Sequence, residues 1–228
     1  MTVSAVLFDF SGTLFRLEDD QSWADDLIGE DGQPFDVRET AEIMRRMTAP
    51  VEQYVQFDAE GQIAWERRDL DPQLHRKAYA EVLRQSGVPT VRQSERLYRR
   101  LIDPMAWTPY PDTEDVLTSL SAQRIPVGVI SNIAFDVRPA FSARGWDRLV
   151  ESFALSFEIG AIKPDPRIFR VALEQLGVRA DAALMVGDSA EADGGATALG
   201  CRFALVDALP TAERPDALLR VLQQYELG

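Results

Sequence analysis

Two hydrophobic patterns alternate along this chain and divide it into unlike parts. Short unbroken apolar runs, typical of strands buried on both faces, occur at residues 5–8 and again after residue 105. Between them, residues 16–105 carry no convincing buried strand, and their apolar positions recur at helical spacing. The pattern therefore predicts an all-helical segment inserted into an α/β unit.

The inserted segment is predicted to contain helices over residues 36–49, 71–86 and 91–102. Asp36, with Glu39 three residues later, suits the N-terminus of the first of these helices. Asp71 before Pro72 suits the N-terminus of the second. The stretch 51–66 is ambiguous, because its apolar spacing suggests a helix while a glycine within it suggests a break.

Prolines at 104, 109 and 111 mark a boundary beyond which strands and helices alternate. The predicted strands are 125–130, 153–156, 183–186 and 202–206. The predicted helices are 112–123, 135–144, 166–176, 190–199 and roughly 211–226. This alternation implies a parallel sheet with right-handed crossovers, which the first strand must join to bury its apolar faces. We therefore expect a Rossmann-like α/β core formed by residues 1–15 and 106–228, and an all-helical domain formed by residues 16–105.

Charge and composition narrow the classes of partner. The chain has 228 residues and a formal net charge of −13, which argues against nucleic acid and anionic membranes as partners. No apolar run approaches the ~20 residues that span a bilayer, and the N-terminus lacks the pattern of a secretory signal. The single cysteine, Cys201, cannot form an internal disulfide, so we expect a cytoplasmic protein. The sequence carries no signal for an oligomeric state.

Polar residues follow the predicted strands at the points where each strand ends. They are Asp9, Ser11 and Thr13, then Ser131 and Asn132, then Asp188, Ser189 and Asp193. Ligands of open parallel sheets bind at the carboxyl ends of the strands. Lys163 lies just before the helix predicted at 166–176, and it is one of only two lysines among 24 basic residues, the other being Lys77. Because Arg and Lys differ in shape and hydration, a retained lysine suggests a site that needs a compact ammonium.

Together these residues resemble the motifs of a haloacid dehalogenase (HAD) superfamily hydrolase with a helical cap between its first two motifs. The matching segments are Asp9-Phe10-Ser11-Gly12-Thr13, Ile130-Ser131-Asn132, Lys163-Pro164-Asp165-Pro166, and Gly187-Asp188-Ser189 with Asp193. The resemblance covers essentially the whole chain and implies a HAD-like fold with residues 16–105 as the cap.

The resemblance also implies a set of roles. Asp9 would be the nucleophile that accepts a phosphoryl group as an aspartyl-phosphate. Mg²⁺ would be held by Asp9, by the backbone carbonyl of Ser11 and by Asp188, with Asp193 as a further ligand or just outside the ligand sphere. The expected phosphate-binding residues are Gly12, Thr13, Ser131, Asn132 and Lys163. The expected partner is a small phosphorylated substrate.

Ser11 departs from the family pattern. Similar phosphatases carry aspartate there, and that carboxyl protonates the leaving group and then activates water. A serine hydroxyl does not titrate near neutral pH, and loss of a general acid–base group typically costs about 10²–10⁴-fold in rate. Three interpretations stay open: a substrate with a good leaving group, a replacement group from the cap, or a weak binding protein for phosphate ligands. The replacement candidates are Glu18, Asp19, Asp20, Asp25, Asp26 and His75.

Other relatives without aspartate at this position set the alternatives. Phosphonatases have alanine and use a cap lysine as a Schiff base, for which Lys77 is the only candidate in residues 16–105. The 2-haloacid dehalogenases have tyrosine, use no metal and lack the Gly-Asp pair of the fourth motif. P-type ATPases have threonine but need membrane helices. The presence of Gly187, Asp188 and Asp193 favours phosphoryl transfer over dehalogenation.

Overall fold

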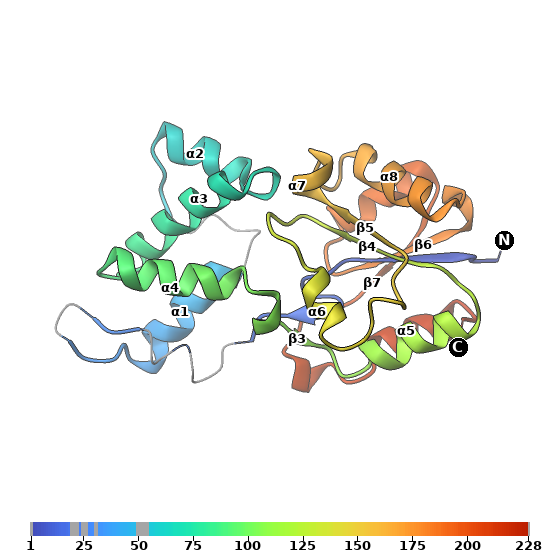
Figure 1. Cartoon of the computed structure of the whole chain (residues 1–228), viewed down its shortest axis with the longest axis horizontal. Coiled ribbons are helices and arrows are strands. Elements are labelled where there is room, and N and C mark those ends of the chain that lie inside the picture. Colours follow the sequence, from blue (N-terminus) through green and yellow to red (C-terminus); the bar gives the residue numbers. More distant parts are fainter. Residues whose placement is uncertain (1, 19–22, 24–26, 30–31, 49–54, 228) are drawn as a thin grey trace.

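A five-stranded parallel sheet lies in the right-hand part of the computed structural model as drawn in Figure 1. The structure describes residues 2–18, 23, 27–29, 32–48 and 55–227. The strands follow the order β5-β4-β1-β6-β7. Their bounds are Ala5–Phe8 for β1, Val127–Ser131 for β4, Ser152–Leu155 for β5, Ala183–Gly187 for β6 and Arg202–Leu205 for β7. The predicted N-terminal strand therefore occupies the central position, between β4 and β6.

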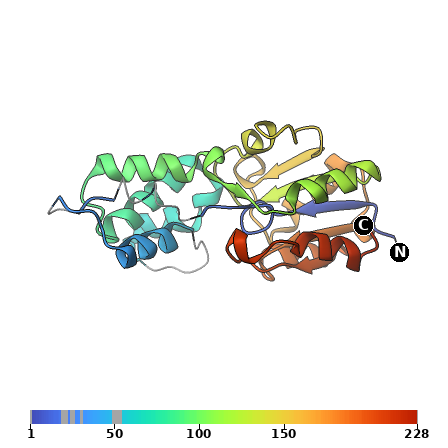
Figure 2. The ribbon, with the colours of Figure 1, turned by 90° about the horizontal axis from the view of Figure 1, so that it is seen from below.

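The residues of β1 are all apolar because helices cover both faces of the sheet. Val6 and Phe8 pack on one face, in the same core cluster as α5 (Thr113–Ala122) and α9 (Ala217–Gln224). Leu7 packs on the other face with α8 (Pro166–Leu176). Figure 1 shows α5 and α9 below the sheet and α8 above it, and Figure 2, a view from below, shows α5 and α9 side by side. Successive residues of a strand point to opposite faces, so a strand covered on both sides must be apolar throughout.

A pair of two-residue strands connects the sheet region to the inserted helices. In this antiparallel pair, Phe15 of β2 (Phe15–Arg16) lies opposite Pro109 of β3 (Thr108–Pro109). The chain thus leaves the sheet region and returns to it through adjacent segments. Two residues are too few to show the alternation that marks a strand, so the sequence did not predict this pair.

Between β2 and β3 lies the helical insertion, which stands apart from the sheet (Figure 1). It contains α1 (Val37–Thr48), α2 (Ala59–Glu66), the 3₁₀ helix η2 (Arg68–Leu70), α3 (Pro72–Gln85) and α4 (Val91–Leu101). The predicted capping of α1 is confirmed: the Asp36 N–H donates to Glu39, and the Glu39 N–H donates to Asp36. Asp71 likewise caps α3. The α/β fold with an all-helical insertion is confirmed, while the division into 1–15 with 106–228 and 16–105 stays a prediction.

Three of the predicted helices differ from the structure, in each case at a proline or a glycine. The helix predicted over 135–144 is only α6 (Arg138–Ser142), because proline is tolerated in the first turn of a helix and not in its interior. Pro215 separates the 3₁₀ helix η6 (Thr211–Glu213) from α9, where one helix over 211–226 was expected. Adjacent glycines disfavour an α-helix over 190–199, which forms the 3₁₀ helix η5 (Asp193–Leu199).

Three smaller elements complete the described chain. A short helix, α7 (Ser156–Ile159), follows β5 directly where the sequence predicted a strand to residue 156. The 3₁₀ helices η3 (Pro104–Ala106) and η4 (Ala180–Ala182) precede β3 and β6. No helix within the described residues has both the length and the apolar character to cross a membrane.

Candidate active site

A cavity of about 970 Å³ lies between the carboxyl ends of the strands and the helical insertion. Asp9, Lys163 and Asp188 line it from the sheet side, and Trp65 and Asp69 line it from the insertion. Polar groups from both parts of the chain therefore face one space. This is the edge of the sheet where the sequence predicted a site.

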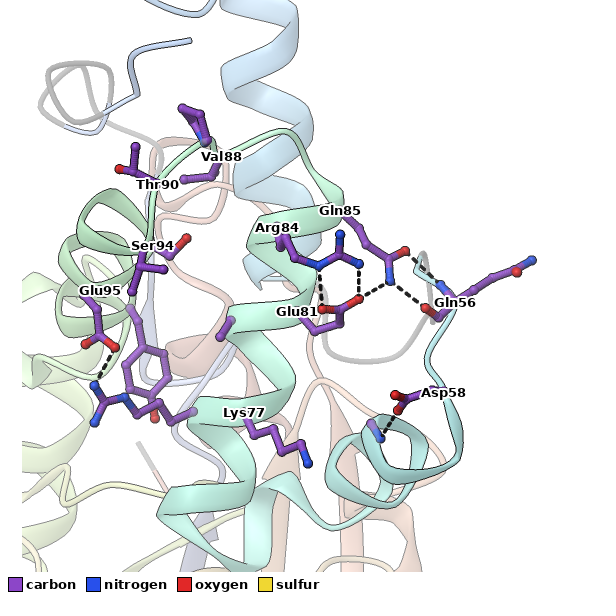
Figure 3. Close-up of a pocket in the computed structure, with 16 residues that line it drawn as sticks. Gln56, Asp58, Lys77, Glu81, Arg84, Gln85, Val88, Thr90, Ser94 and Glu95 are labelled. Carbon is purple, nitrogen blue, oxygen red and sulfur yellow. Dashed lines mark hydrogen bonds and ion pairs between the residues drawn. The ribbon is translucent and has the colours of Figure 1, made fainter. Parts of the chain in front are cut away.

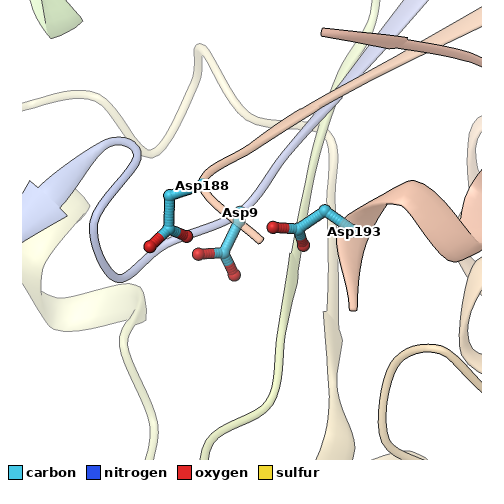
Figure 4. A group of neighbouring side chains, drawn as sticks. All are labelled: Asp9, Asp188 and Asp193. Atoms are coloured by element: carbon cyan, nitrogen blue, oxygen red, sulfur yellow. The ribbon is translucent and has the colours of Figure 1, made fainter. Parts of the chain in front are cut away.

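Asp9 lies where β1 ends, and its backbone N–H donates to the Val186 carbonyl at 2.9 Å. This bond continues the β1–β6 ladder by one residue and fixes where the Asp9 side chain leaves the sheet. The carboxylates of Asp9, Asp188 and Asp193 point toward one another (Figure 4), and one oxygen of each lies within 4.8 Å of the others. The structure thus brings together the three aspartates that the sequence assigned to a metal site.

Lys163 neutralises part of the negative charge of these aspartates. Its ammonium donates to Asp9 Oδ1 at 2.6 Å, to Asp193 Oδ1 at 2.6 Å and to the Ile130 carbonyl at 3.2 Å. Burial alone would lower the pKa of Lys163, but the charges and hydrogen bonds of Asp9 and Asp193 outweigh it and raise that pKa. A buried ammonium is tolerated only with such partners. Lys163 is therefore a fixed positive charge beside Asp9.

The cluster keeps an excess of negative charge. Burial raises the pKa of Asp9 well above its usual value, Lys163 lowers it, and the charges of Asp193 and Asp188 raise it further. Burial and the charge of Asp193 also raise the pKa of Asp188, against the attraction of Lys163. Three carboxylates face one ammonium, and carboxylate oxygens are the ligands that Mg²⁺ prefers. The donor set and its charge therefore fit a divalent cation.

Two glycines allow the aspartates to approach the backbone. A Cβ on Gly187 would lie 2.2 Å from the Asp193 carboxyl carbon. Gly12 has φ +76°, and a Cβ there would lie 2.4 Å from Asp188 Oδ2. Both positions therefore need glycine, the first for space and the second for space and backbone conformation. Asp193 is held in turn by the Ser189 N–H, which donates to its Oδ2 at 2.9 Å.

The predicted phosphate-binding residues divide into two groups. Gly12, Ser131, Asn132 and Lys163 line the cavity, and so does Ser11. Asn132 also forms two hydrogen bonds with the backbone of Lys163. Its Oδ1 accepts the Lys163 N–H at 2.7 Å, and its Nδ2 donates to the Lys163 carbonyl at 3.1 Å. Thr13 is fully buried and is not among the residues that line the cavity. The geometry favours a structural role for Thr13 in the turn.

Arg214 supports the loop after β1 and was missed by the sequence analysis. Its guanidinium, which is buried against the Tyr110 ring, donates to the carbonyls of Gly12, Thr13 and Asp207. These bonds hold the turn that follows Asp9. Arg214 comes from the distant segment before α9, and no motif or periodic pattern in the sequence marks it among the many arginines.

Of the residues suggested as replacements for the missing acid, Glu18 and His75 lie within the described part of the chain, and neither is among the residues that line the cavity. Glu18 is bound to the Thr211 N–H at 2.7 Å. His75 is buried, with its Nδ1 3.0 Å from the Tyr98 hydroxyl, and burial and the charge of Arg68 lower its pKa to about 3. The remaining candidates, Asp19, Asp20, Asp25 and Asp26, lie outside the described residues.

Lys77 lines a different cavity, of about 800 Å³, between α2, α3 and α4 (Figure 3). It is paired with Glu60. Other charged side chains there are also paired, such as Arg84 with Glu81 at 2.6 Å. Since this cavity shares no lining residue with the Asp9 cavity, the geometry does not support a Schiff base between Lys77 and a substrate held at Asp9.

Asp69 is a carboxyl that the sequence analysis did not single out. It belongs to η2 and lines the same cavity as Asp9 and Ser11. Burial raises its pKa, while the charges of Arg68 and Lys163 lower it. The sequence around it is a run of charged residues without a motif, so only the fold shows that it faces the site.

A parallel α/β sheet with an aspartate after its central strand, a buried lysine and two further aspartates at its carboxyl edge agrees with the hydrolase class that the sequence motifs resemble. The sequence profile described as "haloacid dehalogenase-like hydrolase" matches residues 3–199, and the chain belongs to this family.

Similar proteins include phosphatases and dehalogenases. The phosphoserine phosphatase of Thermus thermophilus is 29% identical over 143 residues, which cover 62% of this chain and 57% of that protein. A glyceraldehyde 3-phosphate phosphatase of Methanothermobacter thermautotrophicus is 32% identical over 116 residues, 46% of this chain and 48% of that protein. The L-2-haloacid dehalogenase structure from Xanthobacter autotrophicus superimposes with TM-score 0.65 at 23% identity, covering 99% of this chain and 87% of that one. The chain spans about half the length of the curated relatives it matches, and the structural likeness shows the fold.

Proposed function

We propose that this protein is a Mg²⁺-dependent phosphatase that acts on a small phosphorylated metabolite through an aspartyl-phosphate on Asp9. The observation that carries the proposal is the cluster of Asp9, Asp188 and Asp193 around the buried ammonium of Lys163. The phosphatases among the similar proteins support the same chemistry. The Asp188 carboxyl beside Asp9 favours a metal and a phosphoryl group over metal-free dehalogenation.

In the first step, a carboxylate oxygen of Asp9 forms a bond to phosphorus while the bond from phosphorus to the leaving oxygen breaks. Lys163 and the Ser131 hydroxyl offset the charge of the phosphoryl oxygens. Asp9, the Ser11 carbonyl and Asp188 would hold Mg²⁺, with Asp193 beside them. The cation would neutralise charge on the phosphoryl group. In the second step, water attacks phosphorus and the bond to Asp9 breaks, which restores the carboxylate and releases phosphate.

The helical insertion would act as the cap of this site. It forms the opposite wall of the cavity through residues such as Trp65 and Asp69. A wall on this side of the cavity reduces the access of bulk water and strengthens the electrostatic contacts with the substrate. We propose that residues 16–105 select the substrate and residues 1–15 and 106–228 carry the chemistry.

Phosphate release from a panel of phosphorylated metabolites, measured with Mg²⁺, tests the proposal. The natural protein should release phosphate, and Asp9→Asn should reduce the rate to background. Asp181→Asn is the matched control, because Asp181 is paired with Arg179 on the surface at 2.8 Å. Equal activity in Asp9→Asn and the natural protein would sink the assignment of Asp9.

Ser11 supports a second candidate, a phosphate-binding protein with little turnover. The Ser11→Asp variant discriminates between the two functions. A rise in turnover by orders of magnitude, from a natural rate near background, would favour the binding protein. If the natural protein already turns over and Ser11→Asp changes its rate little, another group supplies the general acid. Halide release from 2-haloacids in excess chelator would instead indicate a dehalogenase.

A further inference from the structure

The element η2 carries a carboxyl to the wall of the cavity that faces the sheet. Asp69 lines the cavity from this wall, and its side chain is 19% exposed. The nearest cation on its own element is Arg68, whose Nη2 lies 3.8 Å from Asp69 Oδ2, beyond hydrogen-bond distance. The Arg68 guanidinium instead stacks on the Trp65 ring and donates to the Trp65 carbonyl at 2.7 Å. Arg68 therefore forms an ion pair with Asp69 at 3.8 Å without donating a hydrogen bond to its carboxyl.

A hydrogen-bonded anchor ties Asp69 to the site on the sheet. The Ser156 hydroxyl, at the start of α7, donates to the Asp69 backbone carbonyl and accepts the Ile133 N–H at 2.8 Å. Ile133 follows directly after Ser131 and Asn132, which line the cavity. Ser156 is fully buried, so this link is shielded from water. One side chain thus fixes Asp69 relative to the loop that is expected to bind phosphate.

The electrostatic surroundings suit a carboxyl that carries a proton. Burial favours the neutral acid and raises the pKa of Asp69, while Arg68 and Lys163 favour the carboxylate. Tyr79 of α3 also faces this pair, with a pKa that burial raises to about 12, so it adds no charge at neutral pH. Proton donors of phosphoryl transfer work best when their pKa lies near the working pH.

We propose that Asp69 is the general acid and base of this enzyme, in the role that Ser11 cannot fill. The inference rests on the proposed phosphatase function. As Asp9 bonds to phosphorus, the bond to the leaving oxygen breaks, its electron pair stays on that oxygen, and the Asp69 carboxyl gives its proton there. In the second step the Asp69 carboxylate takes a proton from the attacking water, and the Asp9–phosphorus bond breaks. The products are the alcohol and inorganic phosphate, with both aspartates restored.

The dependence on the leaving group tests this role. A general acid matters most for a poor leaving group, so Asp69→Asn should lower kcat for benzyl phosphate by about 10²–10⁴-fold. For 4-nitrophenyl phosphate, whose leaving group needs little protonation, the loss should be much smaller. The double variant Asp69→Asn with Ser11→Asp should recover benzyl phosphate turnover, because it restores a carboxyl two residues after Asp9.

A second carboxyl on the insertion provides the control. Glu66 is at the cavity rim, and its Oε1 accepts from Gln62 Nε2 at 3.0 Å. Glu66→Gln should leave the ratio of the two rates unchanged. Equal losses of Asp69→Asn on both substrates, or no loss on either, would overturn the role of Asp69 and leave the phosphatase function standing. Full activity in Asp9→Asn, or no turnover by either the natural protein or Ser11→Asp, would overturn the function itself.

Discussion

The ammonium of Lys163 lies 2.6 Å from Asp193 Oδ1, and both side chains are almost completely buried. Asp9 Oδ1 lies at the same distance on another side of this ammonium. Breaking a buried ion pair by removing one partner typically costs about 3–5 kcal/mol, because the other charge stays buried. Lys163 therefore stabilises the fold while it positions the charge beside Asp9.

Replacement of Lys163 by methionine should abolish phosphate release and lower the free energy of unfolding by about 3–5 kcal/mol at pH 7 without Mg²⁺. Without the ammonium, Asp9 and Asp188 keep folded pKa values above their unfolded ones, so the loss should shrink as the pH falls and these two carboxylates take up protons. Urea unfolding at pH 7 and pH 5 measures both effects.

Lys77 provides the matched control for this experiment. It is on the surface of the helical insertion, and its side chain is 43% exposed. Lys77→Met should change the free energy of unfolding by no more than about 0.5 kcal/mol and leave activity unchanged. If both lysine variants lose the same stability, the buried cluster is not the source of the effect.

A methyl group at Gly187 should disturb the site through Asp193. The added Cβ would lie 2.2 Å from the Asp193 carboxyl carbon, and that carboxylate is bonded to both Lys163 and the Ser189 N–H. Because Asp193 cannot retreat, Gly187→Ala should cost about 1–3 kcal/mol of unfolding free energy, the usual range for overpacking. Phosphate release should fall as well, since Asp193 holds Lys163.

The neighbouring Gly194 tests whether the effect is specific. A Cβ at Gly194 would meet only the Phe203 ring, at 3.6 Å, which is ordinary van der Waals contact. Gly194→Ala should therefore be tolerated in both unfolding and activity assays. A Gly187→Ala protein as stable and active as Gly194→Ala would contradict the assigned role of the close approach.

The sequence predicts the sheet and the aspartate cluster because each depends on local patterns. An apolar run ending in a polar residue marks Asp9 and Asp188 wherever the helices later pack, and parallel strands bring their carboxyl ends together. Asp69 and Arg214 have no such local signal: each reaches the site from a segment that only tertiary packing brings near. His75 failed as a candidate for the same reason, because its ring turns into the interior of the insertion toward Tyr98.

Metal binding should reverse the effect of a substitution at Asp188. Burial and the charge of Asp193 raise its folded pKa above the unfolded value of 3.8, so its ionisation removes stability as the pH rises through the folded pKa. Asp188→Asn should therefore stabilise the metal-free protein at pH 7, and this stabilisation should shrink as the pH falls toward the unfolded value.

With Mg²⁺ bound, the natural protein should become more stable than Asp188→Asn. A ligand at 100 times its Kd stabilises the folded state by about 2.7 kcal/mol. The natural protein should gain this stabilisation, and Asp188→Asn should lose most of it. Thermal unfolding with Mg²⁺ and with chelator measures the difference, and Asp181→Asn serves as a surface control. A full Mg²⁺ shift in Asp188→Asn would place the cation elsewhere.

The only histidine should make the helical insertion sensitive to acid. Burial and the charge of Arg68 lower the pKa of His75 from 6.5 to about 3. A group whose folded pKa is depressed contributes stability above its unfolded pKa, and this stability is lost as the pH falls toward the folded pKa. Between pH 7 and pH 5 the natural protein should lose about 2 kcal/mol through this residue, at 1.36 kcal/mol per unit.

His75→Phe keeps an aromatic ring among Tyr79, Tyr98 and Phe135 but does not titrate. Loss of the hydrogen bond to the Tyr98 hydroxyl lowers its stability by a similar amount at both pH values, since Tyr98 stays neutral. The difference in urea unfolding free energy between pH 7 and pH 5 should therefore be about 2 kcal/mol smaller in the variant than in the natural protein. If both proteins show the same pH dependence, His75 takes up a proton without lowering the stability of the helical insertion.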